Sequence, residues 1–265
     1  LLLLQDAKGI GSLPRKTPRD PAFAPIDGRG ELWPGAGIAG RSHVFLVASR
    51  VRLYSSVLFS YKLTGSEMLV LDPTTFRVVG QRDLPRPQGI GWGSAIHTSG
   101  RYAYIYGIAG GNGRLRVYLA RSRADDLRSR WSYFTGSRWS GRARDARHLG
   151  LEGFNTSFSV FTHRGRLFVL NEEPGFSRPV YLRAATRPEG PFGRAKMVYV
   201  PPVRGPRYAY NAVVHPQIAG PGVVFGYSVN SSDDADLFAN LDALLPGFAR
   251  IPENCFAKVA KPPES

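Results

Sequence analysis

One layout recurs four times along the chain: a short strand pattern, a turn that contains glycine, and an aromatic or β-branched strand. Glycine supplies the positive φ that tight hairpin turns need. Such repetition limits the possible folds strongly, because each repeat must form one unit that buries its apolar face against its neighbours. The four stretches are 31–50, 89–108, 153–172 and 210–230.

Equivalent positions of the four repeats hold Trp33, Trp92, Asn155 and Asn211, which are 59, 63 and 56 residues apart. Two further strand patterns follow three of the hairpins, at 68–71 with 76–79, 115–120 with 131–135, and 180–184 with 196–200. Four antiparallel strands in each repeat are typical of a β-propeller blade. A two-sheet sandwich is the alternative fold, but it would not repeat with this period.

The repeats predict an all-β propeller that forms a single domain over residues 1–256 and is followed by a flexible tail over 257–265. The blades are expected near 31–88, 89–152, 153–209 and 210–256, with part of another blade before them. The stretch Leu1–Leu4 is too short for the core of a signal peptide and follows no basic region. We therefore interpret the start of the chain as a cut inside a larger protein.

Residues 231–245 predict a short C-terminal helix packed on the rim of the propeller. Ser231 or Ser232 can cap this helix, and aspartates follow in its first turns. The apolar side chains at its core-facing positions are Leu237, Leu241 and Leu244.

Composition removes several classes of function. Hydrophobic residues make up 43% of the chain and charged residues 21%, as in ordinary globular proteins. The single cysteine, Cys255, excludes an internal disulfide and a cysteine-based zinc site. The histidines show no spacing typical of a metal site, and no phosphate-binding loop or HExxH pattern occurs. We expect no cofactor, no metal and, because no apolar run approaches 18 residues, no membrane span.

The net charge of +15 comes from 35 basic and 20 acidic residues. Of the basic residues 29 are arginine, a bias that a GC-rich genome explains more simply than a nucleic-acid site, so no nucleic-acid partner is expected. Residues 101–147 contain eleven arginines but only three aspartates, so this stretch is strongly basic. Binding of an acidic polymer to this stretch is a weaker alternative, and it would depend steeply on salt.

The innermost strand of each blade lines the channel of a propeller, so its ends and loops are candidate binding positions. Neutral donors and acceptors suit sugar hydroxyls, and aromatic rings suit the C–H face of a sugar. The alternatives are that the tryptophans fill space between blades, that the asparagines satisfy backbone groups, and that His215 is a buried hydrogen-bonding residue. The candidate substrate-binding residues are Trp33, Trp92, Ser94, Asn155, Ser157, Tyr210, Asn211, His215 and Asn230.

Glycoside hydrolysis usually needs two carboxylates. The candidate catalytic residues are Glu172 and Glu173, at the end of a strand, and Glu152, just before the next inner strand. Adjacent strand residues point to opposite faces, so at most one of Glu172 and Glu173 can face the channel. Few acidic residues accompany the inner strands, which favours the alternative of a non-catalytic propeller that binds a glycan or a protein.

Several segments together resemble a known family. They are WGSAIHTSGRYAYIYG (92–107), VYLARSRADDL with WSYFTG (117–136), VYLRAATRPEGPFG (180–193) and YNAVVHPQI with GYSVNS (210–231). The chain resembles the actinobacterial propeller family, long filed as a domain of unknown function, that includes endo-D-arabinanases. It is similar in layout to the five-bladed furanosidase propellers.

The resemblance implies a five-bladed propeller that lacks part of its first blade and acts on an arabinan-type polysaccharide. A secreted or cell-envelope location follows from that substrate. We expect the protein to be a monomer. A Gly-Asp-Thr turn, which carries an Asp in such enzymes, is absent from this chain. Ala36 occupies the WPGAG turn, which would be another natural place for a carboxylate.

Overall fold

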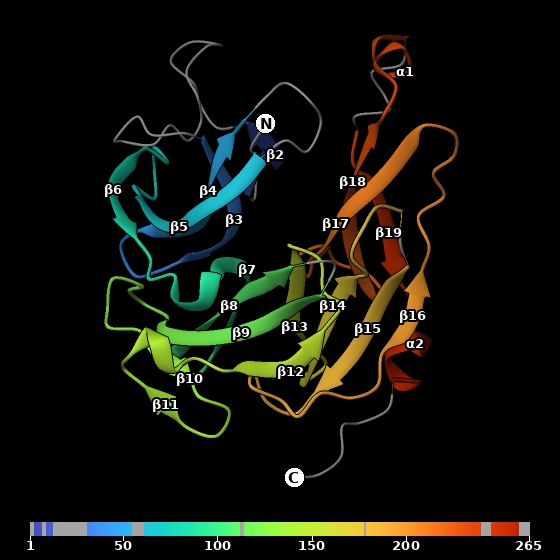
Figure 1. Ribbon diagram of the computed structural model, residues 1–265. Helices are drawn as coiled ribbons and strands as arrows, with labels where there is room; N and C mark the ends of the chain where they lie inside the picture. Colours follow the sequence, from blue (N-terminus) through green and yellow to red (C-terminus); the bar gives the residue numbers. More distant parts are fainter. Residues whose placement is uncertain are drawn as a thin grey trace.

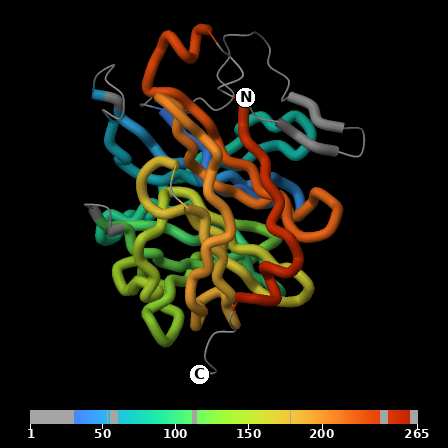
Figure 2. Tube along the Cα trace, turned by 90° about the vertical axis from the view of Figure 1, so that its right-hand side faces the viewer, coloured from blue at the N-terminus to red at the C-terminus, as the bar shows by residue number. Residues whose placement is uncertain are grey.

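The computed structural model describes residues 3–6, 9–12, 31–54, 61–111, 114–177, 179–239 and 245–259. Four antiparallel sheets follow one another along the chain, and their first strands contact one another in that order (Figure 1). Seen after a quarter turn, the fourth sheet lies in front and the third sheet lies beside it (Figure 2). The expected all-β propeller is confirmed.

The first sheet contains β3 (Glu31–Ala39), β4 (Val44–Leu53), β5 (Tyr61–Leu71) and β6 (Val78–Asp83). The second contains β7 (Gly91–Ser99), β8 (Tyr102–Gly111), β9 (Arg114–Arg123), β10 (Ser132–Phe134) and β11 (Trp139–Ser140), with β12 (His148–Glu152) beside β9. The third contains β13 (Phe158–His163), β14 (Arg166–Glu172), β15 (Val180–Ala185) and β16 (Lys196–Tyr199). The fourth contains β17 (Arg207–His215), β18 (Val223–Ser231) and β19 (Gly247–Ile251).

The number of blades differs from the expectation of five. The described residues form four blades, together with a two-stranded sheet of β1 (Leu3–Asp6) and β2 (Gly9–Ser12). Contacts join β3 to β7, β7 to β13 and β13 to β17, whereas no comparable contact joins β17 to β3 in the described part of the chain. The four sequence repeats account for the four blades, and the expected partial blade has no further counterpart among the described residues.

Apolar residues fill the spaces between neighbouring sheets. Successive strand residues point to opposite faces, so a strand inside a propeller contributes to two cores. In β14, Leu167 and Val169 pack against the second sheet, and Phe168 and Leu170 pack against the fourth. This alternation fixes which residues of β14 can reach the junction of the second and third sheets.

Bulges interrupt three inner strands next to the equivalent positions of the repeats. The register shifts between Pro34 and Gly37 in β3, between Trp92 and Ala95 in β7, and between Tyr210 and Val213 in β17. A Cβ added to Gly35 would lie only 2.6 Å from the carbonyl oxygen of Gly93. The bulges of β3 and β7 therefore approach each other closely, which only glycine permits.

The helices differ from the single C-terminal helix that was expected. The described residues contain two short α-helices, α1 (Asp234–Ala239) and α2 (Glu253–Ala257). Asp233 caps α1, because its carboxylate accepts a hydrogen bond from the N–H of Ala235 at 2.9 Å, so the serine-capped start was wrong. Leu241 and Leu244 lie outside the described residues.

Helix α1 meets the rim of the fourth sheet through the ion pair of Asp236 with Arg207 at 2.8 Å, and not through a buried apolar face in its described part. No residue of α1 is buried, Phe238 is 85% exposed, and the helix projects from the body of the molecule (Figure 1). Helix α2 instead packs Phe256 into the core of the third and fourth sheets. Val259, which the sequence placed in a flexible tail, is buried in the same core. Within the described ranges, no helix has the length and apolar character needed to cross a membrane.

Candidate functional site

A pocket of about 520 Å³ lies where the second and third sheets meet. One side comes from the end of β12 and the residue after it, and the other from the paired strands β14 and β15 and the loop between them. The lining residues are Glu152, Gly153, Asn171, Glu173, Pro174, Tyr181, Arg183 and Ala195. Two of the three candidate catalytic carboxylates therefore line one pocket.

Strand pairing explains why these side chains converge. Asn171 pairs with Tyr181 across β14 and β15, and Val169 pairs with Arg183. Paired residues and their neighbours two positions along share one face of a sheet, so Asn171, Tyr181 and Arg183 point to the same side. Glu173 continues this face beyond the end of β14.

Glu172 points the other way, as strand alternation requires. It pairs with Val180, which belongs to the core between the third and fourth sheets, and it is only 1% exposed. The structure therefore separates the two adjacent glutamates. Glu173 borders the pocket, and Glu172 is buried away from it.

Neighbouring side chains hold both pocket carboxylates. Tyr181 is hydrogen-bonded to Glu173, and this bond, with burial as a lesser cause, raises the pKa of the tyrosine. Arg116 donates from Nε to Oε1 of Glu152 at 2.9 Å. The two carboxylates thus have hydrogen-bonded partners on opposite sides of the pocket, although the Arg116–Glu152 pair is about half exposed.

Two further side chains have unused hydrogen-bonding capacity inside the pocket wall. Asn171 is 1% exposed and donates from Nδ2 to the carbonyl oxygen of Glu172 at 3.4 Å. Among the described residues, its Oδ1 and the Nε of Arg183 have no hydrogen-bond partner. Burial lowers the pKa of Arg183, whose guanidinium carbon lies 5.4 Å from the ring centroid of Phe154. Because unpaired buried polar atoms are costly, both atoms suit a ligand that supplies hydroxyl groups.

The two candidate tryptophans occupy different environments. Trp33 is 38% exposed, its ring centroid lies 4.6 Å from that of Tyr61, and it remains available to a ligand. Trp92 is 2% exposed and donates from Nε1 to the carbonyl oxygen of Pro85 at 2.8 Å. It packs against Trp131, so its assignment to binding is corrected: it fills space between sheets, the alternative left open by the sequence.

Two of the candidate asparagines bind backbone groups. Oδ1 of Asn155 accepts a hydrogen bond from the N–H of Thr156, and Oδ1 of Asn230 accepts one from the N–H of Ser231, each at 2.8 Å. These local bonds match the alternative that short polar side chains satisfy the backbone at strand ends. Ser157, just before β13, is half-buried.

Three other candidates lie on inner strands. Ser94 and Asn211 are half-buried at the bulges of β7 and β17, and Asn211 adopts a positive φ of 58°. Tyr210 lies beside Asn211 near the start of β17. These positions surround the same end of the inner strands, although none of the three lines the pocket.

His215 does not belong to this end of the molecule. His215 is the last residue of β17 and lies six residues beyond Ala209. Ala209 is hydrogen-bonded to Ser177 in the β14–β15 loop. At 3.3 Å per residue, about 20 Å separate the two positions along the strand. Burial lowers the pKa of His215, and its ring lies 5.7 Å from that of Phe248. We therefore remove His215 from the candidate binding set.

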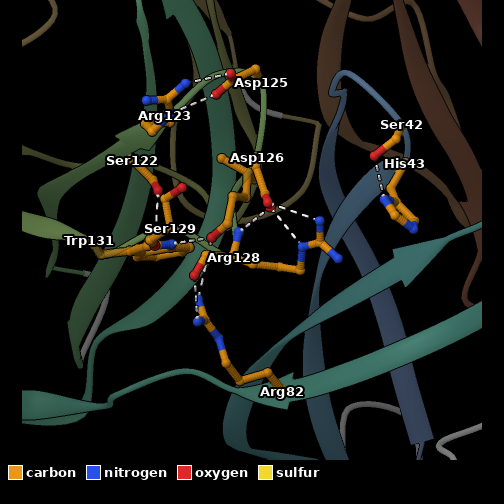
Figure 3. Close-up of polar contacts among 11 residues, drawn as sticks. Ser42, His43, Arg82, Ser122, Arg123, Asp125, Asp126, Arg128, Ser129 and Trp131 are labelled. Carbon is orange, nitrogen blue, oxygen red and sulfur yellow. Dashed lines mark hydrogen bonds and ion pairs between the residues drawn. The ribbon is translucent and has the colours of Figure 1, made fainter.

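Part of the arginine-rich stretch meets the first sheet, because Arg82 of β6 donates to the carbonyl oxygens of Arg128 and Leu127 at 3.2 and 3.4 Å (Figure 3). Asp125 pairs with Arg123 at 2.7 Å and with Arg41 at 3.3 Å, and Asp126 pairs with Arg128 at 2.8 Å. These ion pairs fix the loop between β9 and β10. No group of three or more His, Cys, Asp or Glu side chains suited to a metal ion occurs in the part of the chain that the structure describes.

Sequence reasoning missed Tyr181, Arg183 and Asn171. Their signal was present in the alternation of polar residues at 171 and 173 and at 181 and 183. That alternation became informative only when the pairing register placed the two runs side by side.

The fold and the pocket define an all-β propeller with a polar, carboxylate-bearing pocket between two blades. Residues 14–254 match the family described as Domain of unknown function (DUF5005), and the chain belongs to this family. The expected resemblance to a propeller family without an assigned function is supported at this level. No curated protein matches the chain.

Among solved structures, the chain is similar to "a putative hydrolase" from Bacteroides ovatus ATCC 8483, with a TM-score of 0.68 and 18% identity. The match covers 83% of this chain and 60% of the length of that protein. CoXyl43, a GH43 β-xylosidase/α-arabinofuranosidase from a compost microbial metagenome, gives a TM-score of 0.37 at 9% identity, over 89% and 94% of the two chains. The GH43_1 enzyme from Xanthomonas citri gives a TM-score of 0.37 at 12% identity, and the match covers 88% of this chain and 91% of that enzyme.

Proposed function

We propose that this chain is a glycoside hydrolase-like propeller that acts on a furanose polysaccharide, an arabinan of the kind that endo-D-arabinanases cut. The observation that carries the proposal is the convergence of Glu152 and Glu173 in one pocket whose wall also offers Asn171 and Arg183. The sequence segments that resemble an arabinanase-containing family support the choice of substrate. Such a substrate lies outside the cytoplasm, so we propose a secreted or cell-envelope location.

The chemistry asks for two carboxyl groups on either side of a glycosidic bond. One donates a proton to the leaving oxygen, and the other assists water or attacks the anomeric carbon. Glu173, oriented by Tyr181, and Glu152, oriented by Arg116, supply such a pair from opposite walls. No cofactor is required for these steps.

Recognition of the sugar falls to the neutral and cationic groups of the wall. Oδ1 of Asn171 accepts a hydrogen bond from one sugar hydroxyl, and Nε of Arg183 donates one to a hydroxyl or ring oxygen. Both atoms are shielded from solvent, so the sugar reaches them only when a wall side chain turns to expose them, and its hydroxyls then remove the cost of their unpaired state.

Digestion of mycobacterial arabinogalactan, with linear L-arabinan as the comparison substrate, tests the proposal. We expect the wild type to release oligosaccharides from the D-arabinan. Glu173→Gln and Glu152→Gln should each reduce release at least a hundredfold, because general acid–base catalysis contributes about that much. Asp83→Asn is the matched control, since it neutralises an exposed carboxylate at the end of β6. Release by both glutamine variants at the wild-type rate would disprove the catalytic assignment.

A non-catalytic glycan-binding propeller is the second candidate. Ala36, at the bulge of β3, favours it, because a carboxylate was expected in that turn. Retention of the protein on an arabinogalactan affinity gel, with no oligosaccharide released after prolonged incubation, would support this candidate over hydrolysis.

A further inference from the structure

Three aromatic rings gather beside the start of β17. Phe176, in the loop between β14 and β15, lies 4.6 Å from Tyr208 and 5.9 Å from Tyr210, measured between ring centroids. The two tyrosine rings lie 5.8 Å apart with an interplanar angle of 35°. We call this group the aromatic platform.

The backbone holds Phe176 in place. The N–H of Ser177 donates to the carbonyl oxygen of Ala209 at 2.8 Å, and the N–H of Ala209 donates to Oγ of Ser177 at 3.2 Å. Ser177 has a φ of +54° and Gly175 a φ of +110°. A residue other than glycine keeps such a conformation only where its surroundings fix it. Ser177 therefore anchors the loop to both backbone groups of Ala209 in β17, and yet Phe176 is 41% exposed.

The same loop forms part of the pocket. Glu173 and Pro174 line the pocket, and Phe176 is only two residues further along. Successive Cα atoms are 3.8 Å apart, so the Cα atoms of Pro174 and Phe176 lie within about 7.6 Å of each other. The sheets that carry the two sites are neighbours (Figure 1), because β14 contacts β17.

We propose that the aromatic platform is a second sugar-binding subsite, which takes the next units of a glycan chain whose first unit occupies the pocket. This inference rests on the proposed function. Aromatic rings pack against the C–H faces of sugars, and the tyrosine hydroxyls supply hydrogen bonds at the rim. Phe176 and Tyr208 thereby join Tyr210 as binding residues, and the protein selects a polymer over a short sugar.

Affinity as a function of chain length tests the inference. D-arabinan oligosaccharides of two to eight units are titrated calorimetrically into the Glu152→Gln protein, which prevents their cleavage. We expect affinity to rise with length, and Phe176→Leu to weaken the longer oligosaccharides by about three- to tenfold while leaving the disaccharide unchanged. Phe176→Trp keeps an aromatic ring at this position, so it should bind every oligosaccharide as tightly as the parent protein.

Phe248→Leu is the matched control, because Phe248 is 58% exposed on β19 and lies against His215. An equal affinity of the parent and Phe176→Leu for every length would overturn the subsite and leave the pocket proposal intact. Failure of the parent to bind an oligosaccharide of any length would overturn the proposed function, and the subsite with it.

Discussion

Replacing Gly93 by alanine should destabilise the propeller severely, because two inner strands pack through this bulge. A Cβ at this position would lie 2.5 Å from Cγ1 and 2.8 Å from Cβ of Val47, which is fully buried. Val47 is β-branched and its χ1 is restricted, so it cannot rotate away freely. The backbone at Gly93 also has a φ of +97°.

The magnitude follows from these two costs. A residue other than glycine at such a φ costs about 1–3 kcal/mol, and forcing extra volume into a packed core costs about 1–3 kcal/mol more. We expect Gly93→Ala to lose about 4 kcal/mol, or about 10 °C in Tm. Gly100→Ala is the matched control, since its φ is +56° and a Cβ there would meet no atom within 4 Å. Its cost should be about 1–2 kcal/mol.

Thermal and urea unfolding of both variants measure the difference. A Val47→Ala/Gly93→Ala double variant tests the contact, because removing the valine methyls relieves the closer overlap, with Cγ1 at 2.5 Å, although the contact with Cβ at 2.8 Å remains. The glycine substitution should cost at least 1 kcal/mol less in that background. Equal losses for Gly93→Ala and Gly100→Ala, together with strictly additive costs in the double variant, would refute the argument that the bulge is a packing point.

Three other predictions concern named contacts. In Glu173→Gln the pKa of Tyr181 should fall towards its ordinary value of about 10, since the bond to Glu173 raises it; ultraviolet titration of tyrosine ionisation checks this, and an unchanged pKa contradicts the contact. Hydrogen bonding to His163 lowers the pKa of Glu253 below 4.5. The stability gained from Glu253 should therefore be complete above about pH 4.5 and lost as the pH falls through the folded-state pKa. Urea unfolding of wild type and Glu253→Gln between pH 3 and 7 tests this, because the two should converge in acid; a constant gap is the opposing result. Trp92→Phe should cost about 1–3 kcal/mol by leaving the carbonyl oxygen of Pro85 unpaired, and an unaltered urea midpoint would argue against this.

The repeating hairpins predicted the propeller because the repeats can be read directly from the sequence, and each repeat forms one blade. The number of blades was not predictable in the same way, because four repeats fit the described structure without the fifth blade that the resemblance implied. Helix α1 shows a similar limit. Its leucine spacing indicated an apolar packed face, whereas the described part of α1 is held to the fourth sheet by the ion pair of Asp236 with Arg207 and buries no residue.

The candidate site was partly predictable. Strand alternation alone showed that Glu172 and Glu173 must diverge, and the pairing of β14 with β15 decided which one borders the pocket. Trp92 could not be assigned from sequence, because a buried and an exposed tryptophan occupy the same place in the repeat. Arg183 and Tyr181 became candidates only through the register between strands, which no single stretch of sequence contains.

The central claim is that the pocket between the second and third sheets is the glycan site. Calorimetric titration of a D-arabinan oligosaccharide into the wild type and into Arg183→Met tests it most directly, because methionine keeps much of the apolar packing over Phe154 and removes the guanidinium. We predict at least tenfold weaker binding by Arg183→Met with an unchanged Tm. Equal affinity of the two proteins would place the glycan elsewhere on the propeller and contradict the account.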